Sequence, residues 1–143
     1  MRARMIGATL VGAVAFGWAP SVGAHHAFSA EFDANTPVHM QGTVVRVEWI
    51  NPHAWIHIEV AGENGHSERW MVEGGNPHNL FRRGFTRDTI AIGMEIIVDG
   101  YASKDGTRRA NGRDLTLPSG QMLFMGSSGT GAPLDGRDPT EPD

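Results

Sequence analysis

Apolar and polar residues alternate with a period of two along several short stretches of this chain, and this pattern constrains the fold most strongly. Successive side chains of a β-strand point to opposite faces of a sheet, so the alternation predicts half-buried strands. In the first stretch, Val45, Val47 and Trp49 are expected on one face, with Arg46 and Glu48 on the other. The predicted strands cover roughly residues 38–49, 54–60, 67–73 and 94–102, and residues 114–117 with 121–125 predict a final strand or hairpin.

One short helix is expected between the third and fourth strands. Asn76 is a good N-cap, Pro77 suits the first helical position and Gly84 suits the left-handed position that follows a helix, so residues 77–83 are predicted to be helical. Three strands, a helix and two strands form the order of the OB-fold, a small five-stranded Greek-key barrel. The predicted class is therefore all-β with one short helix, and another antiparallel β-roll is the alternative.

The N-terminal segment has the pattern of a cleavable signal peptide. Arg2 and Arg4 precede an uncharged, mostly small or apolar run that Pro20 ends, and small residues precede a cut after Ala24. The apolar run is shorter than the roughly 20 residues that cross a bilayer, so no stable membrane span is expected after cleavage. We therefore predict export to the periplasm and a mature chain that begins with His25.

Composition separates the mature chain into one domain and a tail. The chain has no Cys, so a disulfide scaffold is excluded, and the fold must be held by packing. Loss of Arg2 and Arg4 takes the formal net charge from −4 to −6, which disfavours nucleic acid as a partner. Residues 126–143 are acidic and rich in Gly and Pro, and we expect them to be disordered. Residues 25–125 then form one domain of ordinary size.

The sequence also resembles an exported bacterial family that is catalogued only as a domain of unknown function. The resemblance covers nearly all of the mature domain and implies a periplasmic setting, with no activity or substrate. The segments that carry it are His25-His26-Ala27-Phe28, Phe32-Asp33, Gly42-Thr43-Val44, Val47-Glu48-Trp49, Asn51-Pro52-His53-Ala54-Trp55, Glu73-Gly74-Gly75, Arg82-Arg83-Gly84, Gly100-Tyr101, Lys104-Asp105-Gly106, Arg109-Ala110-Asn111-Gly112-Arg113, Leu117-Pro118 and Gly126-Ser127-Ser128.

Four histidines suggest a copper site. Cleavage after Ala24 would give His25 a free α-amine, which can chelate one ion together with the His25 imidazole. One more imidazole would complete a planar three-nitrogen set, and such sets favour Cu(II). His26 could bind instead, through the amine, the intervening amide and its own ring. His53 and His57 are the candidate folded ligands, although four residues along one strand span about 13 Å, too far for both to bind one ion.

Structural roles are the alternatives for these histidines. His25 and His26 could simply begin a soluble terminus, since a signal peptidase leaves the following residues fairly free. His53 could hydrogen-bond the backbone of its turn, and His57 could be a packed or exposed strand residue.

A second group of residues suggests a metal-free binding or assembly module. Arg108, Arg109 and Asn111 fall in the expected loop after the fourth strand, which flanks the ligand face of OB-folds, so with Trp55 they could bind an anionic or sugar-like ligand. The alternative is that the arginines offset nearby carboxylates on a solvated surface. No motif of a hydrolase, nucleotide-binding enzyme or zinc protease is present, so we expect a non-enzyme that binds a metal ion, a small molecule or a periplasmic protein.

Overall fold

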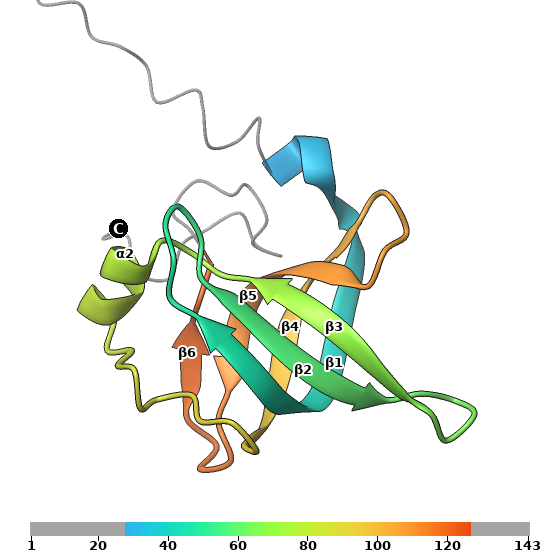
Figure 1. The fold of residues 1–143 in the computed structure, drawn as a ribbon. Helices are drawn as coiled ribbons and strands as arrows, with labels where there is room; N and C mark the ends of the chain where they lie inside the picture. The colour runs from blue at the N-terminus through green and yellow to red at the C-terminus, as the bar shows by residue number, and fades with distance from the viewer. Residues whose placement is uncertain (1–27, 127–143) are drawn as a thin grey trace, which may run out of the picture.

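The computed structural model describes residues 28–126, which form six strands and one short helix after an N-terminal helical turn at 28–31 (Figure 1). None of the helices in this part of the chain is long and apolar enough to cross a membrane. In chain order the elements are β1 (Phe32–Glu48), β2 (Trp55–Ala61), β3 (Ser67–Glu73), α2 (Pro77–Arg82), β4 (Glu95–Ser103), β5 (Arg109–Thr116) and β6 (Met122–Phe124).

The strands close into a ring. Their order is β3-β2-β1-β4-β5-β6 with antiparallel neighbours, and a parallel pairing of β3 with β5 joins the two sides. One edge of β5 pairs with two different strands. Its first residues, Arg109 to Asn111, pair with β3, and its last residues, Asp114 to Thr116, pair with β6. The predicted class, mainly antiparallel β with a short helix between the third and fourth strands of an OB-type order, is confirmed.

The fifth strand begins earlier than predicted. Arg109 and Asn111, which we expected in a loop, lie within β5, and Arg108 precedes it. Asn111 and Gly112 together suggest a turn, but they lie in a strand that packs closely against β4. The approach is so close that a Cβ on Gly100 of β4 would collide with the carbonyl oxygen of Asn111. Tertiary contact therefore overrides local composition.

A β-bulge interrupts the predicted alternation of the first strand at Val45. The pairing of β1 with β2 shifts register between Val44 and Arg46, which leaves Val45 as the extra residue. Val44 is completely buried, whereas Val47 and Trp49 pack against the core from beyond the bulge. The strict alternation that placed Val45 with Val47 fails for this reason.

The core fills the ring and the space under α2. Asn76 caps the helix by accepting a hydrogen bond from the His78 backbone N–H at 2.9 Å, and Leu80 is 1% exposed. Met125, also 1% exposed, packs where Gly112 lacks a side chain, and its carbonyl accepts the Gly75 N–H at 2.7 Å. The other core residues that are at most 1% exposed are Val44, Ala54, Ile58, Val72, Ile96, Val98, Ala110 and Leu115.

A second, smaller apolar cluster lies outside the ring. Phe28 of the N-terminal turn stacks with Phe32 and meets Tyr101 edge to face, with ring centroids 5.8 and 5.9 Å apart. All three side chains are buried. The cluster fixes the point where the described chain begins against β4.

Met125 provides a direct test of this packing. Met125→Ala should lower the free energy of unfolding by about 2–5 kcal/mol, because it removes a buried side chain and leaves a cavity. Met122→Ala is the matched control, since Met122 is 64% exposed, and it should change stability by less than about 0.5 kcal/mol. Urea denaturation measures both. Equal effects of the two substitutions would contradict the placement of Met125 in the core.

Candidate functional site

One row of cross-strand partners runs over the outer face of the ring. Glu48 of β1 lies opposite Trp55 of β2, Trp55 opposite Glu73 of β3, Glu73 opposite Asn111 of β5, and Asn111 opposite Tyr101 of β4. The residues beside them in sequence, such as Val72 and Ala110, are fully buried in the core. Because neighbours along a strand point to opposite faces, the row points outward. We call these five residues the outer row.

Glu73 is the central polar group of the outer row. Its side chain is only 12% exposed, and hydrogen bonding by the neighbouring Asn111 side chain is one of the influences on its ionisation. Burial raises the pKa of Glu73, as does the nearby negative charge of Glu31, while His53, Arg109 and the Asn111 bond act in the opposite direction. The outer row therefore holds a carboxyl group whose charge is costly and open to influence from a bound cation or donor.

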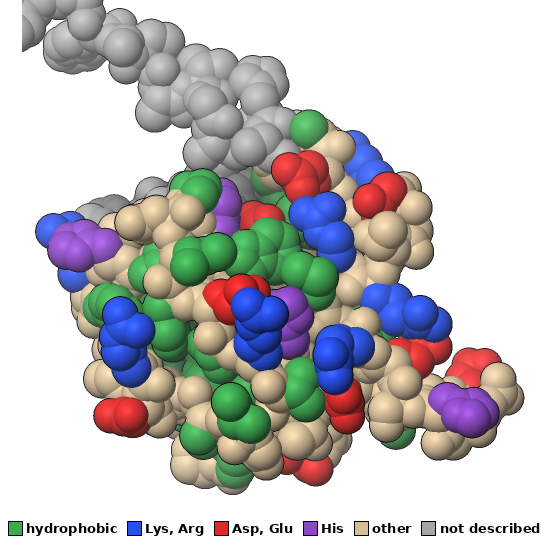
Figure 2. All heavy atoms as spheres, in the orientation of Figure 1, with side chains coloured by type: hydrophobic (Ala, Val, Ile, Leu, Met, Phe, Trp, Pro, Cys, Tyr) green, Lys and Arg blue, Asp and Glu red, His purple; other side chains and the backbone are tan. Residues whose placement is uncertain are grey.

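Arg109 joins the N-terminal turn to the outer row. Its Nη2 donates to Glu31 Oε2 at 2.7 Å, and its guanidinium lies 5.5 Å from the centre of the Trp55 ring and 5.8 Å from that of Phe32. A cleft of about 310 Å³ opens beside it, lined by Ala30, Glu31, Ser103, Lys104, Asp105 and Arg109. Figure 2 shows this face of the molecule, where apolar side chains lie among acidic, basic and histidine side chains.

His53 lies next to Glu73 in the turn that precedes β2. Its Nδ1 is 3.2 Å from the Gly74 carbonyl oxygen and 3.4 Å from Glu73 Oε1, and both are acceptors. Nδ1 therefore carries the hydrogen, so the unprotonated nitrogen of the neutral ring is Nε2. The expected backbone bond of a turn histidine is present, and it leaves a nitrogen with the character of a metal ligand.

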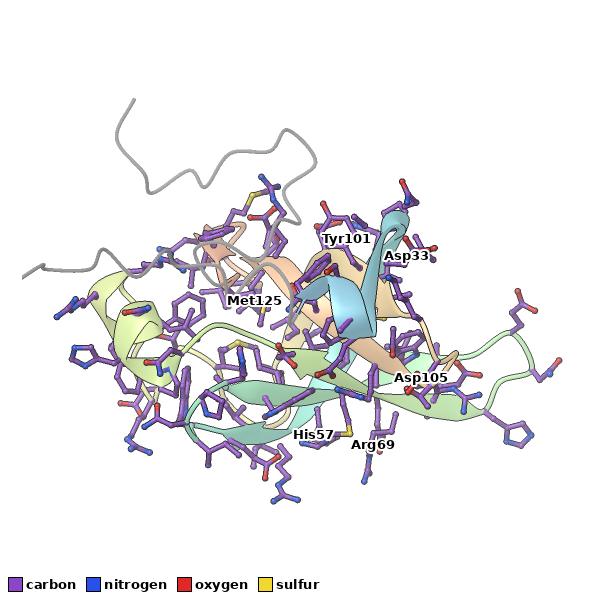
Figure 3. The ribbon with its side chains drawn as sticks, turned by 90° about the horizontal axis from the view of Figure 1, so that it is seen from above. Asp33, His57, Arg69, Tyr101, Asp105 and Met125 are labelled. Atoms are coloured by element: carbon purple, nitrogen blue, oxygen red, sulfur yellow. The ribbon has the colours of Figure 1, made fainter. Side chains whose placement is uncertain are left out.

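His57 is held in a different way. Its Nε2 is 2.8 Å from Glu48 Oε2, and its side chain is 11% exposed. The hydrogen bond with His57 is the main cause of the lowered pKa of Glu48. Figure 3 shows His57 and Arg69 on the same side of the sheet. His53 precedes β2 and His57 lies within it, two residues after Trp55, and the two histidines have different partners.

Both of the predicted ligand-binding arginines are paired with carboxylates. Arg108 donates to Glu68 at 2.7 Å, and Arg109 donates to Glu31 at the same distance. Among the predicted ligand-binding residues, Trp55, Arg109 and Asn111 come together at the outer row, whereas Arg108 is bonded to the other end of β3. These ion pairs weaken the expectation of an anionic ligand.

Glu31 and Glu73 are site residues that sequence reasoning missed. Glu73 precedes Gly74-Gly75 at the end of an alternating strand, which signals close backbone packing but does not reveal that the carboxyl lies between His53 and Asn111. His25 and His26 lie outside the described residues. Within residues 28–126, no three His, Asp or Glu side chains are placed so that they could hold a metal ion.

Fold and site together define a small β-ring domain with a polar and aromatic cluster on its outer face. The model of a family described as a family of unknown function (DUF6152) matches residues 14–112, and the chain belongs to this family. Comparison with curated proteins and with solved structures found no match.

The raised pKa of Glu73 predicts a pH dependence of stability. An acid with a higher pKa in the folded state stabilises the fold fully below its unfolded pKa, near 4.5, and this contribution is lost as the pH rises through the folded pKa. In metal-free protein, the free energy of unfolding of the parent should therefore fall relative to Glu73→Gln between pH 4 and 7, roughly the window above that unfolded value.

Urea denaturation across this pH range provides the measurement. Glu59→Gln is the control, because Glu59 is also on the outer face but is 40% exposed and bonded to Arg69 at 2.9 Å. Parallel pH profiles for the parent and Glu73→Gln would show that burial of Glu73 does not govern its ionisation.

Proposed function

We propose that the chain is an exported, periplasmic copper-binding protein, in which the ion is held by the N-terminal histidines of the mature chain and by His53. The observation that carries this proposal is the orientation of His53. Its Nδ1 lies against the Gly74 carbonyl and Glu73, which leaves Nε2 as the ligand atom. A metal-binding histidine usually donates its other ring N–H to a carbonyl or carboxylate in this way.

The position of Phe28 is compatible with N-terminal histidines as the remaining ligands. Phe28 packs against Tyr101 at one end of the outer row, while His53 contacts Glu73, two strands away along that row. Neighbouring strands lie about 4.8 Å apart, so this separation is about 10 Å. Three residues span at most about 10–11 Å, so a chain that begins at His25 can reach the His53 side of the row.

Nitrogen chemistry favours copper as the ion. The α-amine and imidazole of His25, or those of His26 with the intervening amide, would join His53 Nε2 in a three-nitrogen set suited to Cu(II). His57 is not a copper ligand in this proposal, because its Nε2 is already bonded to Glu48. Glu73 would orient His53 and offset part of the positive charge.

The terminal amine provides the sharpest test. The chain that begins at His25 should bind one Cu(II) more tightly than the same chain with one added Gly before His25, because the addition converts the amine into an amide. His53→Ala should weaken binding by about 10–100-fold or more, the range seen on loss of groups that support metal ligands. Affinity should also fall toward pH 5, since the donors must lose protons to bind. Competition against a chelator of known affinity measures each effect.

His66→Ala is the matched control, because His66 is an exposed residue of the β2–β3 hairpin. His25→Ala and His26→Ala distinguish the two modes of terminal coordination. Equal affinities for the chain that begins at His25 and the extended chain would exclude the terminal site. The intact mass of the exported protein tests the cleavage point, and a mass that retains residues 1–24 would contradict it.

A metal-free binding module is the second candidate, and the stacking of Arg109 on Trp55 favours it. This pair places an indole surface beside the buried polar groups of Glu73 and Asn111, an arrangement suited to a sugar-like ligand with an apolar face and several hydroxyl groups.

If this second candidate is correct, a glycan screen should find a ligand whose binding Trp55→Ala reduces at least about tenfold, the loss expected when an aromatic anchor is removed. Arg108→Ala should have no effect, because Arg108 is bonded to Glu68. Isothermal titration measures the affinities. A screen without any binder, together with terminal copper binding, would leave the metal as the ligand.

A further inference from the structure

We propose that a surface beside α2 binds the headgroups of an anionic lipid bilayer, with its apolar side chains entering the edge of the acyl region. The surface consists of Trp49, Ile50, Phe81, Arg82 and Arg87, and we call it the α2 surface. It shares no residue with the outer row or with the proposed copper ligands. Only its location in the cell rests on the proposed export.

Two large apolar side chains of the α2 surface are exposed. Ile50, which follows the end of β1, is 52% exposed, and Phe81 in the last turn of α2 is 37% exposed. Both adjoin Trp49, whose ring centroid lies 5.1 Å from that of Phe81 and 6.4 Å from that of the buried Phe85. Adjoining apolar side chains that remain exposed mark an interaction site.

The turn that carries Ile50 is fixed to α2. The Asn76 side-chain amide, at the N-cap of the helix, donates to Asn51 Oδ1 at 3.0 Å. Leu80 is 1% exposed and anchors the same helix in the core. Figure 1 shows α2 beside the β1–β2 turn. The arrangement of Ile50 and Phe81 is therefore set before any partner binds, which reduces the entropy lost on binding.

Arg82 and Arg87 differ from the other arginines of the described chain. Five arginines form ion pairs with carboxylates, namely Arg46, Arg69, Arg108, Arg109 and Arg113. Arg83 donates to the Gly126 carbonyl and lies over the Phe124 ring. Arg82 and Arg87 are exposed, and neither is paired with a carboxylate from residues 28–126.

The segment around these two arginines is positive in a negative chain. Residues 77–94 contain three arginines and a single acidic residue, Asp88, whereas the chain as a whole has a formal net charge of −4. Figure 2 shows apolar and basic side chains together on the side of the molecule where α2 lies. Unpaired cations beside exposed apolar groups favour an anionic partner.

A lipid bilayer fits this combination better than a soluble acidic protein. Ile50 lies in a turn and Phe81 at the end of a six-residue helix, so both stand at the ends of elements. Proteins that lie on membranes place such apolar side chains at the acyl boundary and their cations among anionic headgroups. The hot spots of protein interfaces instead fill well-packed pockets.

Vesicle co-sedimentation tests the proposal with the metal-free chain that begins at His25. This chain keeps every described residue and lacks the apolar leader, which would itself bind lipid. Vesicles with equal parts of phosphatidylglycerol and phosphatidylcholine should bind it at least about tenfold more tightly than phosphatidylcholine alone. Raising the salt from about 0.1 to 1 M should weaken binding, because the screening length falls from about 10 to 3 Å. Equal affinity for the two lipids, or no binding to either, would overturn the proposal.

Paired arginine substitutions locate the contact. Arg82→Gln with Arg87→Gln should lower the affinity for anionic vesicles at least about tenfold, because each cation near such a surface contributes about fivefold. Arg69→Gln with Arg108→Gln is the matched control. It removes the same charge from exposed arginines that are bonded to Glu59 and Glu68, and it should change affinity by less than about threefold. Equal losses in the two variants would assign binding to net charge and reject the α2 surface.

Ile50→Ser with Phe81→Ser tests the apolar contact. The affinity should fall at least about tenfold, because two apolar side chains no longer enter the acyl boundary. Met122→Ser is the control, since Met122 is exposed on β6, and it should leave the affinity unchanged. If the double variant does not fold, Ile50→Ser alone decides, and unchanged affinity would reject insertion.

Two further measurements separate this proposal from its competitors. Polyglutamate that binds through Arg82 and Arg87, without any binding to vesicles, would assign the surface to an acidic protein and overturn the lipid. His53→Ala should leave vesicle binding unchanged, because the α2 surface contains no copper ligand. Failure of copper binding therefore leaves this test intact, and failure of vesicle binding leaves the copper site intact.

Discussion

The parallel pairing of β3 with β5 is the interaction on which the site depends. It spans only three residue pairs, yet it closes the ring and places Glu73 directly beside Asn111. Without it, Trp55 and Glu73 would lie near one edge of an open sheet, and Asn111 and Tyr101 would lie toward the opposite edge. Ring closure therefore assembles the outer row from five strands that are distant in sequence. The glycines of β4 and β5 allow this close approach, since side chains at Gly100 or Gly112 would meet the neighbouring strand or the core.

Much of the fold could be predicted from the sequence because its signals are local. The alternation in β3 gave both ends of that strand, and the caps at Asn76 and Gly84 located the helix. The errors occurred where distant residues decide the structure. The bulge at Val45 depends on the pairing with β2, and the early start of β5 depends on Gly100 of β4. Neither contact leaves a mark in the local pattern.

The same distinction between local signals and distant contacts applies to the candidate site. His53, Trp55, Arg109 and Asn111 could be selected from their residue types, and the structure brings them to one region. Glu73 could not, because a glutamate on an alternating strand is ordinarily solvated, and its importance arises from burial between His53 and Asn111. The distinction between His53 and His57 was equally hidden. Both lie near a glutamate, but His53 presents Nδ1 to its acceptors, whereas His57 presents Nε2 to Glu48.

The burial of Phe28 gives the chain a tether of fixed length. A group attached three residues before an anchored side chain explores a volume only about 10 Å in radius, so its effective concentration near the outer row reaches the millimolar range or higher. Inserted residues between His25 and Phe28 would dilute that group, and loss of the Phe28 anchor against Tyr101 would release it altogether. Under the proposed function, the small aromatic cluster outside the ring would determine how strongly an N-terminal ligand competes with free ligands for the outer row.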